Sequence, residues 1–306
     1  MKTAVLTSFT RSPFFYVGDK YKLLPQISQL FPKEFDRIIE PFVGGGSVFL
    51  NTEASEVLAN DLDSNVIDIH ELLYSQGEQM DQFISKFAKL ARSYGLTCSF
   101  DGDLVPEDVR KEFPKTYFAY LNRAGYAKLK EKYNRSEKRD AIELYTLMIY
   151  GFNRMLRFNR AGDFNIPVGN VDFNPNVVRA LQGYSAKTVG RKVSFSNLEF
   201  EVFLNSITYR KGDFLYVDPP YLITASEYNK GWDDICESRL YAILDHLNTL
   251  GVKFAVSNVE IYGDRANVIL EKWMQKYKVH TVSSNYINYF DNGKKKLKEV
   301  LVCNYE

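Results

Sequence analysis

The fold is decided by the stretch DRIIEPFVGGGS, residues 36–47, in which a short apolar strand runs into three glycines. Residues 36–40 are predicted as that strand, and we expect a helix to start at Ser47 and reach Ala54. A second strand is expected around 57–60, followed by a helix from Ser64 to about Tyr74. A strand, a glycine turn, a helix and another strand in this order open a doubly wound α/β sheet.

Residues 78–158 have a different pattern. Their apolar residues recur at helical spacing, no strand is predicted, and residues 98–106 are expected to be a loop between helices. Strand and helix patterns return afterwards, in the order strand 192–196, strand 214–217, helix 233–250, strand 252–257, helix 266–277 and a closing antiparallel pair, 278–283 with 299–305. We therefore predict one α/β domain from residues 1–75 and 160–306, with residues 76–159 inserted as a helical domain.

Charge is unevenly distributed along the chain. The net charge is only +1, yet residues 110–160 contain 13 Lys/Arg against 5 Asp/Glu. Such an excess favours one face that meets a polyanion, and a solvated helical surface is the alternative. The whole composition, 45% hydrophobic and 25% charged, is typical of a globular protein.

The sequence gives no signal for metal, disulfide or membrane. The three cysteines and three histidines are scattered, so a disulfide framework or a zinc site is not expected. No leader-like segment is recognised near Met1, and no stretch approaches the length of a membrane span. We expect a cytoplasmic protein.

The glycine turn can approach a ligand closely because its glycines lack Cβ atoms. Asp61 follows at the end of the next strand, where a carboxylate can accept hydrogen bonds from a ribose. The turn matches neither the GxGxxG fingerprint nor the phosphate loop, so a nucleoside without pyrophosphate, such as S-adenosylmethionine, fits better. A purely structural turn is the alternative, as is a helix N-cap role for Asp61, for which Asp63 and Ser64 compete.

A second turn, DPPY, follows the apolar strand 212–217. The two prolines have no N–H groups and hold the chain extended, so that the Asp218 carboxylate and the Pro219 carbonyl are acceptors at the strand's carboxyl end. Two such acceptors can hold the hydrogens of an exocyclic amino group and aim its lone pair at a methyl donor. Tyr221 offers a ring on which a flipped base can stack. A rigid turn with a satisfied aspartate is the alternative.

These segments together resemble the D12 class of adenine-specific DNA methyltransferases, in the class α order of cofactor motif, recognition insertion and catalytic motif. The resemblance covers nearly the whole chain. Besides DPPY, the matching segments are YVGDKYKLL at 16–24, EPFVGGGSVFLN at 40–51, RMLRFNRAGDFNIPVG at 154–169 and a tail made of SSNY at 283–286 and KKLKEVLVCNY at 295–305.

The resemblance implies a Rossmann-like methyltransferase sheet that binds S-adenosylmethionine and no metal, with a helical target-recognition domain at 76–159. It implies that the substrate is double-stranded DNA with a specific short site, whose adenine is flipped out and methylated at N6. The implied catalytic residues are Asp218, Pro219, Pro220 and Tyr221. The implied cofactor-binding residues are Tyr16, Lys20, Glu40, Phe42, Gly44, Gly46, Ser47, Asp61 and Asp218. The implied DNA contacts are Arg123, Arg154, Arg157, Asn159 and Arg160, with Arg157 suited to reading guanine.

Residues 117–134 depart from the relatives that methylate GATC and are closer to restriction-modification relatives. The recognition sequence therefore stays open, and a cognate restriction endonuclease that acts separately is a candidate partner. Cytosine-N4 methylation is the nearest alternative activity, although such enzymes more often have Ser at the position of Asp218. Methylation of protein glutamine, a DNA-binding module of the same fold without catalysis, and a nicotinamide-dependent oxidoreductase fit these motifs less well.

Overall fold

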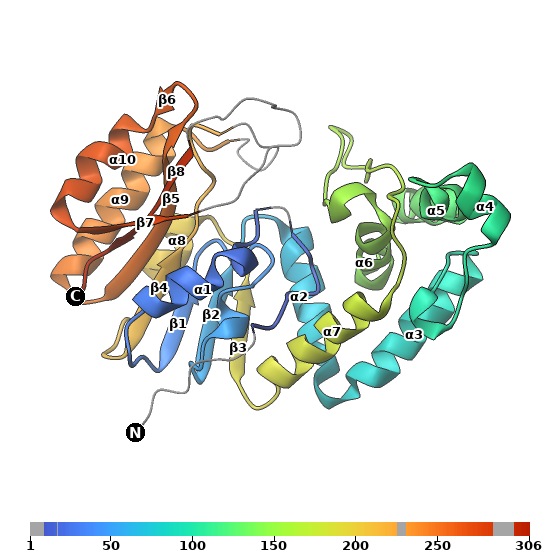
Figure 1. The fold of residues 1–306 in the computed structure, drawn as a ribbon. Coiled ribbons are helices and arrows are strands. Elements are labelled where there is room, and N and C mark those ends of the chain that lie inside the picture. Colours follow the sequence, from blue (N-terminus) through green and yellow to red (C-terminus); the bar gives the residue numbers. More distant parts are fainter. Residues whose placement is uncertain (1–8, 17, 225–230, 284–296) are drawn as a thin grey trace. The chain divides into compact units, whose positions relative to one another are not determined.

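The computed structural model describes residues 9–16, 18–224, 231–283 and 297–306, and the chain divides into two compact units (Figure 1). The helical unit consists of Met1–Asp19, Gly44–Asn51 and Asp63–Gly190. The sheet unit consists of Lys20–Val43, Thr52–Leu62 and Arg191–Glu306. The predicted insertion 76–159 lies within the helical unit, and its role as a recognition domain stays a prediction.

The sheet unit is built on one mixed sheet with the strand order β3-β2-β1-β4-β5-β8-β7, and β6 pairs with β5. The strands are β1 Arg37–Glu40, β2 Glu56–Asn60, β3 Lys192–Ser196, β4 Asp213–Val217, β5 Lys253–Tyr262, β6 Arg265–Ala266, β7 Lys278–Val282 and β8 Leu297–Cys303. The first five strands of this order are parallel, while β8 is antiparallel to both β5 and β7. The predicted doubly wound sheet and its closing antiparallel pair are confirmed.

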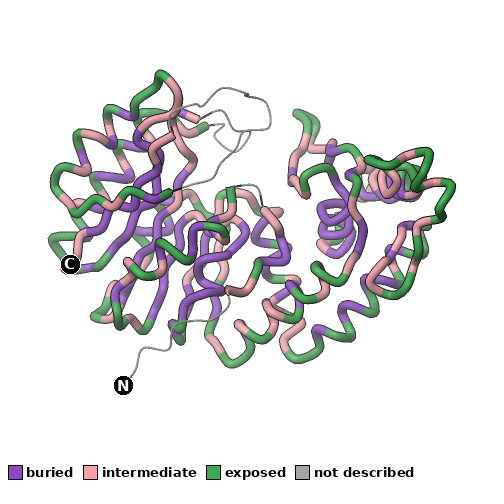
Figure 2. Tube along the Cα trace, viewed as in Figure 1, coloured by how far each residue is buried: buried purple, intermediate pink, exposed green. Residues whose placement is uncertain are grey.

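The central strands β1 and β4 are buried along their whole length (Figure 2). Their apolar side chains alternate between two faces, as the twofold period of a strand requires. At their amino ends, the buried Arg37 guanidinium donates to both carboxylate oxygens of Asp213, at 2.8 and 2.6 Å. This charge-assisted pair fixes β1 against β4, in the register that pairs Arg37 with Asp213.

Helices cover one face of this sheet. They are α8 Phe200–Ser206, α9 Asp234–Thr249 and α10 Val268–Trp273, continued by the 3-10 turn η8 Met274–Lys276. They pack on Leu215 and Val217 of β4 in one hydrophobic core. On the opposite face, Phe31 packs against Phe214 and Tyr216. Phe31 follows a segment made of η1 Lys20–Lys22, α1 Leu24–Ile27 and η2 Ser28–Leu30.

The helical unit contains six α-helices among its described residues: α2 Ser64–Gln76, α3 Met80–Ser93, α4 Glu107–Glu112, α5 Tyr117–Arg135, α6 Ala141–Tyr150 and α7 Pro175–Thr188. Short 3-10 turns are η3 Phe49–Asn51, η4 Gly77–Gln79, η5 Ser99–Asp101 and η6 Phe152–Arg154. Helix α6 is buried from Ile142 to Tyr150 and is the centre of this unit's core. Residues 78–158, all of them described, form no strand beyond isolated bridges at Gly151 and Phe158. Among the described residues, no helix is both long and apolar enough to cross a bilayer.

Two predicted helices differ from the structure. The helix expected at 47–54 is wrong, since only the 3-10 turn Phe49–Asn51 forms there. The Asn51 side chain donates to the carbonyls of Thr10 and Ser47, and this local bonding competes with helix continuation. The helix predicted from residue 266 begins at Val268, because the Asn267 side chain caps it by accepting from the Leu270 N–H.

Candidate active site

The DPPY turn lies at the carboxyl end of β4, where the order of the sheet reverses. Strands β1 and β4 are neighbours, although the chain has passed through β2 and β3 between them. Open α/β sheets bind ligands at such a switch point, beyond the carboxyl ends of the strands. Asp218 is the first residue after β4, and its side chain is 22% exposed. Pro219 is buried and Pro220 half-buried.

Lys20 is the direct partner of Asp218. The Lys20 ammonium lies 2.8 Å from Asp218 Oδ2, and only 5% of the lysine side chain is exposed. It also lies 5.0 Å from the centre of the Tyr221 ring, within the range of a cation–π contact. This charge-assisted pair fixes the position of the Asp218 side chain, whose carboxylate oxygens are hydrogen-bond acceptors.

The Tyr221 hydroxyl lies between two carboxylates. It is 3.1 Å from Asp218 Oδ1 and 3.0 Å from Glu299 Oε1, and Ser257 Oγ is 3.5 Å away. One hydroxyl proton serves one acceptor at a time, so Tyr221 donates to either carboxylate. Burial, followed by the negative charges of Asp218 and Glu299, raises the pKa of Tyr221 well above its ordinary value. Tyr221 is therefore neutral at physiological pH and acts as a donor.

Glu299 is a part of this cluster that the sequence reasoning did not assign. It lies on β8, only 1% of its side chain is exposed, and its Oε1 is 3.9 Å from the Lys20 ammonium. The signal was present, because Glu299 belongs to the tail segment that carries the family resemblance. The SSNY part of that tail, from residue 284 on, and residues 295–296 lie outside the described residues.

The glycine turn in the helical unit is closely packed. Gly46 has a φ of +72°, and a Cβ there would lie 2.4 Å from Phe49 and 2.8 Å from His70. At Gly45 a Cβ would lie 2.9 Å from the Tyr16 Cβ, and at Gly44 it would touch the Tyr16 ring at 3.7 Å. The structure thus brings Tyr16 against the turn, as expected if both serve one ligand. Ser47 Oγ is buried there without a hydrogen-bond partner among the described residues.

His70 supports this turn and was also missed by the sequence reasoning. Its Nε2 lies 2.9 Å from the Gly44 carbonyl, and its Nδ1 lies 3.2 Å from the Tyr184 hydroxyl. Complete burial lowers the pKa of His70 to about 4, against the opposing effect of the Gly44 bond. The neutral ring with Nε2–H therefore donates to Gly44 and accepts from Tyr184. Nothing in the sequence around His70 distinguished it from an ordinary core residue.

Three further residues with predicted cofactor roles lie in the sheet unit. Asp61 follows β2 and is half-buried, and the helix N-cap role weighed for it belongs to Asp63, whose carboxylate accepts from the Asn65 N–H. Glu40 is the buried last residue of β1. The Phe42 ring packs edge-on against Trp232, 5.5 Å between centroids.

The sequence model of the family described as D12 class N6 adenine-specific DNA methyltransferase matches residues 16–287 of the chain. The chain belongs to this family.

Relatives of this methyltransferase-family chain agree with the assignment. Type II methyltransferase M.FokI of Planomicrobium okeanokoites is 33% identical over 307 residues, which are 97% of this chain and 43% of that protein. Modification methylase StsI of Streptococcus sanguinis is 30% identical over 310 residues, with the same two shares. The DNA adenine methylase of Escherichia coli (strain K12) is 25% identical over 301 residues, 95% of this chain and 94% of that protein. The chain thus spans less than half the length of M.FokI and StsI.

The residues predicted to contact DNA lie in the helical unit. Arg123 is exposed on α5, and Arg160 is exposed in the loop that follows η6. The Arg157 guanidinium donates to the Asn165 side chain at 2.8 Å. Asn159 shapes the same loop, because its side-chain oxygen accepts from the N–H groups of residues 161 and 163. Arg154 stacks on Phe15, with 3.8 Å from its guanidinium carbon to the ring centre.

Among the described residues, no group of three or more His, Cys, Asp or Glu side chains is placed to hold a metal ion.

Proposed function

We propose that this chain is a site-specific DNA adenine-N6 methyltransferase, which transfers the methyl group of S-adenosylmethionine to an adenine flipped out of duplex DNA. The observation that carries the proposal is the Asp218 carboxylate, which follows β4 at the switch point of the sheet and is held there by Lys20. Membership of an N6 adenine-specific family supports the same atom as the target.

The proposed chemistry needs two acceptors on the amino group. The lone pair of adenine N6 is delocalised into the ring, so the group is a poor nucleophile in the free base. Asp218 and the Pro219 carbonyl would each accept one N6 hydrogen and pull the nitrogen toward sp³ geometry, so that its lone pair is less delocalised into the ring and points at the methyl donor. The N6–CH3 bond then forms as the S–CH3 bond breaks, and one N6 proton leaves to Asp218 or to solvent. The sulfonium of S-adenosylmethionine supplies the leaving group.

In this proposal, Tyr221 is the stacking surface for the flipped adenine, and Glu299 is a positioning residue. The Tyr221 hydroxyl is held by Asp218 and Glu299, so the ring has little freedom to rotate away. Lys20 lies over the ring and is shared between the two carboxylates. A base stacked on such a ring gains about 1–3 kcal/mol, part of the cost of leaving the duplex.

The residues assigned to S-adenosylmethionine fit a nucleoside ligand. The glycine turn has positions that a Cβ would fill, and the buried Ser47 hydroxyl lacks a partner among the described residues. Asp61 ends β2, where a carboxylate can accept from ribose hydroxyls. The roles of Tyr16, Lys20, Glu40, Phe42, Gly44 and Gly46 in this binding rest on the family resemblance together with their places in the two units.

The product of the reaction tests the proposal. Duplex DNA is incubated with the protein and methyl-labelled S-adenosylmethionine and is then digested to nucleosides. We expect the label in N6-methyladenine. Label in N4-methylcytosine alone would establish the alternative activity instead, and the absence of any labelled nucleoside while DNA is bound would establish the DNA-binding module.

The proposal also includes a specific recognition sequence in the DNA and a restriction endonuclease as the biological partner. The names of two relatives, a Type II methyltransferase and a modification methylase, support a restriction-modification context and a cognate endonuclease that cuts the same sequence. Methylation-sensitive sequencing of DNA from cells that express this chain should show one short motif with methylated adenine. Methylation spread over unrelated sequences would contradict the proposed site specificity.

A further inference from the structure

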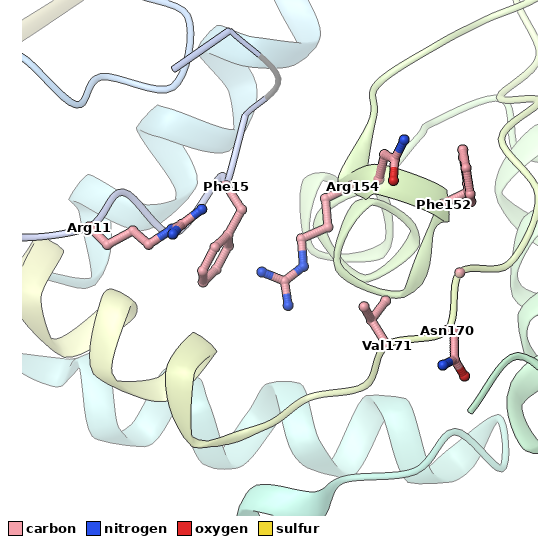
Figure 3. Close-up of a pocket in the computed structure, with 8 residues that line it drawn as sticks. Arg11, Phe15, Phe152, Arg154, Asn170 and Val171 are labelled. Carbon is pink, nitrogen blue, oxygen red and sulfur yellow. The ribbon is translucent and has the colours of Figure 1, made fainter. Parts of the chain in front are cut away.

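A pocket of about 390 Å³ opens in the helical unit (Figure 3). In Figure 3 the Phe15 ring lies between the side chains of Arg11 and Arg154. The Arg154 guanidinium carbon is 3.8 Å and that of Arg11 5.0 Å from the centre of this ring. The complete lining is Arg11, Phe15, Phe152, Asn153, Arg154, Gly169, Asn170 and Val171.

Arg154 brings a positive charge into this pocket, and no carboxylate among the described residues forms an ion pair with it. Its Nε is buried and has no hydrogen-bond partner in that part of the chain. Burial lowers the pKa of Arg154 to about 10, and the charge of Arg11 acts in the same direction, whereas Tyr145 and the charge of Asp172 oppose it. Arg154 is still protonated at neutral pH, so the pocket carries a charge that an anion would neutralise.

The backbone of the pocket is strained at the same place. Phe15, Asn153 and Arg154 have φ values of 49°, 52° and 52°, and they are the non-glycine residues with positive φ in the described part of the chain. All three line the pocket. Asparagine tolerates this conformation, whereas Phe and Arg rarely adopt it. Strain of this kind concentrates where a ligand is held, and here it aims the Phe15 and Arg154 side chains at each other.

The opposite wall is fixed by a helix cap. The Asn170 side-chain oxygen accepts from the N–H groups of Phe118 and Ala119, at 2.8 and 3.3 Å, in the first turn of α5. That helix belongs to the stretch 110–160, where 13 Lys/Arg face only 5 Asp/Glu in the sequence. Of the pocket's own lining, Phe152, Asn153 and Arg154 belong to this basic stretch, and Arg11 brings a second positive charge from outside it.

We propose that this pocket binds one phosphate of the DNA backbone through the guanidinium group of Arg154, which the Phe15 ring holds in place, while Arg11 beside the other face of the ring adds positive charge to the site. The guanidinium fork matches the oxygens of a phosphate, and stacking on an aromatic ring orients it in advance. Such a contact sets the position of the strand and carries no base sequence. The inference rests on the proposed function, which supplies DNA as the ligand. It adds that a backbone phosphate is the group bound and that this pocket is the place where it binds.

The salt dependence of DNA binding tests this site. Arg154→Gly removes the guanidinium and, because glycine accepts positive φ, also relieves the backbone strain. The control is Arg92→Gln, which removes an equal charge from an arginine already paired with Asp101 and Asp103. Binding of a fluorescent duplex is measured by anisotropy at salt concentrations from about 50 to about 200 mM NaCl, without a methyl donor.

We expect Arg154→Gly to bind DNA more weakly, and its log–log salt slope to be shallower by about 0.9, the value for one phosphate contact. The affinity advantage of the wild type should thus shrink by about 3–4-fold across this salt range. The Arg92→Gln slope should match the wild type. A lower melting temperature of Arg154→Gly with an unchanged slope would overturn the proposal and make Arg154 a structural cation. A loss of affinity confined to one DNA sequence would also overturn it, in favour of base reading.

A second measurement uses modified DNA and needs no folded variant. Single phosphates of the duplex are replaced in turn by neutral methylphosphonates. One position should weaken wild-type binding about as much as Arg154→Gly does, and the two changes together should weaken it no further. If no position behaves so, and nucleoside monophosphate binds the wild type but not Arg154→Gly, the pocket serves a free nucleotide and the proposal is wrong. Methyl transfer is assayed separately, so its absence would refute the proposed function without affecting this result.

Discussion

Lys20 and Arg154 are two buried or partly buried cations that differ in their partners. Lys20 in the sheet unit lies 2.8 Å from one carboxylate and 3.9 Å from another. Arg154 in the helical unit stacks on a phenyl ring, and no carboxylate among the described residues pairs with it. Burying a charge without compensation is costly, so an unpaired one points to a partner that arrives later. Lys20 serves the protein's own acid, and Arg154 is free to serve a ligand.

The largest effect is expected at the acid that Lys20 holds. Asp218→Asn keeps the shape of the side chain but removes its charge, so N6 loses a strong acceptor. Methyl transfer in a single turnover should fall about 10³-fold, whereas the affinity for DNA should stay within about twofold. The exposed Asp81 provides the matched control, Asp81→Asn, which should keep the wild-type rate. A decrease of less than tenfold in the rate would contradict the proposed role of Asp218 in catalysis.

The next effect is a loss of stability at the glycine turn. Gly46→Ala places a Cβ against Phe49 and His70 and also strains a positive φ. We expect the free energy of unfolding to fall by about 3 kcal/mol, from overpacking and backbone strain together. Gly95→Ala is the control, because Gly95 has a similar φ of +75° and open space around it. It should lose only about 1 kcal/mol, and equal losses in urea unfolding would show that crowding plays no part at Gly46.

A smaller effect on the rate is expected at Glu299. Glu299→Gln leaves a polar side chain of the same size but removes one of the two charges that hold Tyr221 and Lys20. The rate of methyl transfer should fall about 10–100-fold with little change in the melting temperature, as for other positioning partners.

The double variant with Tyr221→Phe separates positioning from simple stabilisation. If Glu299 acts through the Tyr221 hydroxyl, the double variant should be hardly slower than Tyr221→Phe alone. Fully additive losses would remove Glu299 from the cluster.

The smallest effect concerns the neutral histidine. The pKa of His70 is lowered to about 4 in the folded protein, against about 6.5 in the unfolded chain. The unfolded state therefore binds more protons between these values, so stability is present above pH 6.5 and is lost as the pH falls toward 4. Between about pH 7 and about pH 5.5 the loss should be about 1 kcal/mol. In His70→Gln this part of the pH dependence should be missing, and its persistence in urea unfolding would assign it to other groups.

The features that could be predicted from the sequence are those that depend on residues adjacent in the chain. The DPPY turn and the glycine turn each combine a strand end with local turn chemistry, and both lie where expected. Glu299 joins Tyr221 across 78 residues of chain, and only the antiparallel placement of β8 brings them together. The stacking of Arg154 on Phe15 depends likewise on tertiary packing. The helix expected at 47–54 does not form because the side chain of one residue, Asn51, donates to the backbone carbonyls of Thr10 and Ser47.

The paired Arg37 and Asp213 have a consequence at the other end of their strands. They fix the alignment of β1 with β4 at the amino end, while Asp218 emerges at the carboxyl end of β4. A slip of one residue would move that carboxylate by about 3.3 Å and turn neighbouring side chains to the other face. A misplacement of about 1 Å can cost about 100-fold in rate. The Arg37–Asp213 pair therefore helps to set the position of the Asp218 carboxylate relative to its substrate. Removing this pair should lower the rate of methyl transfer even where β1 and β4 remain paired.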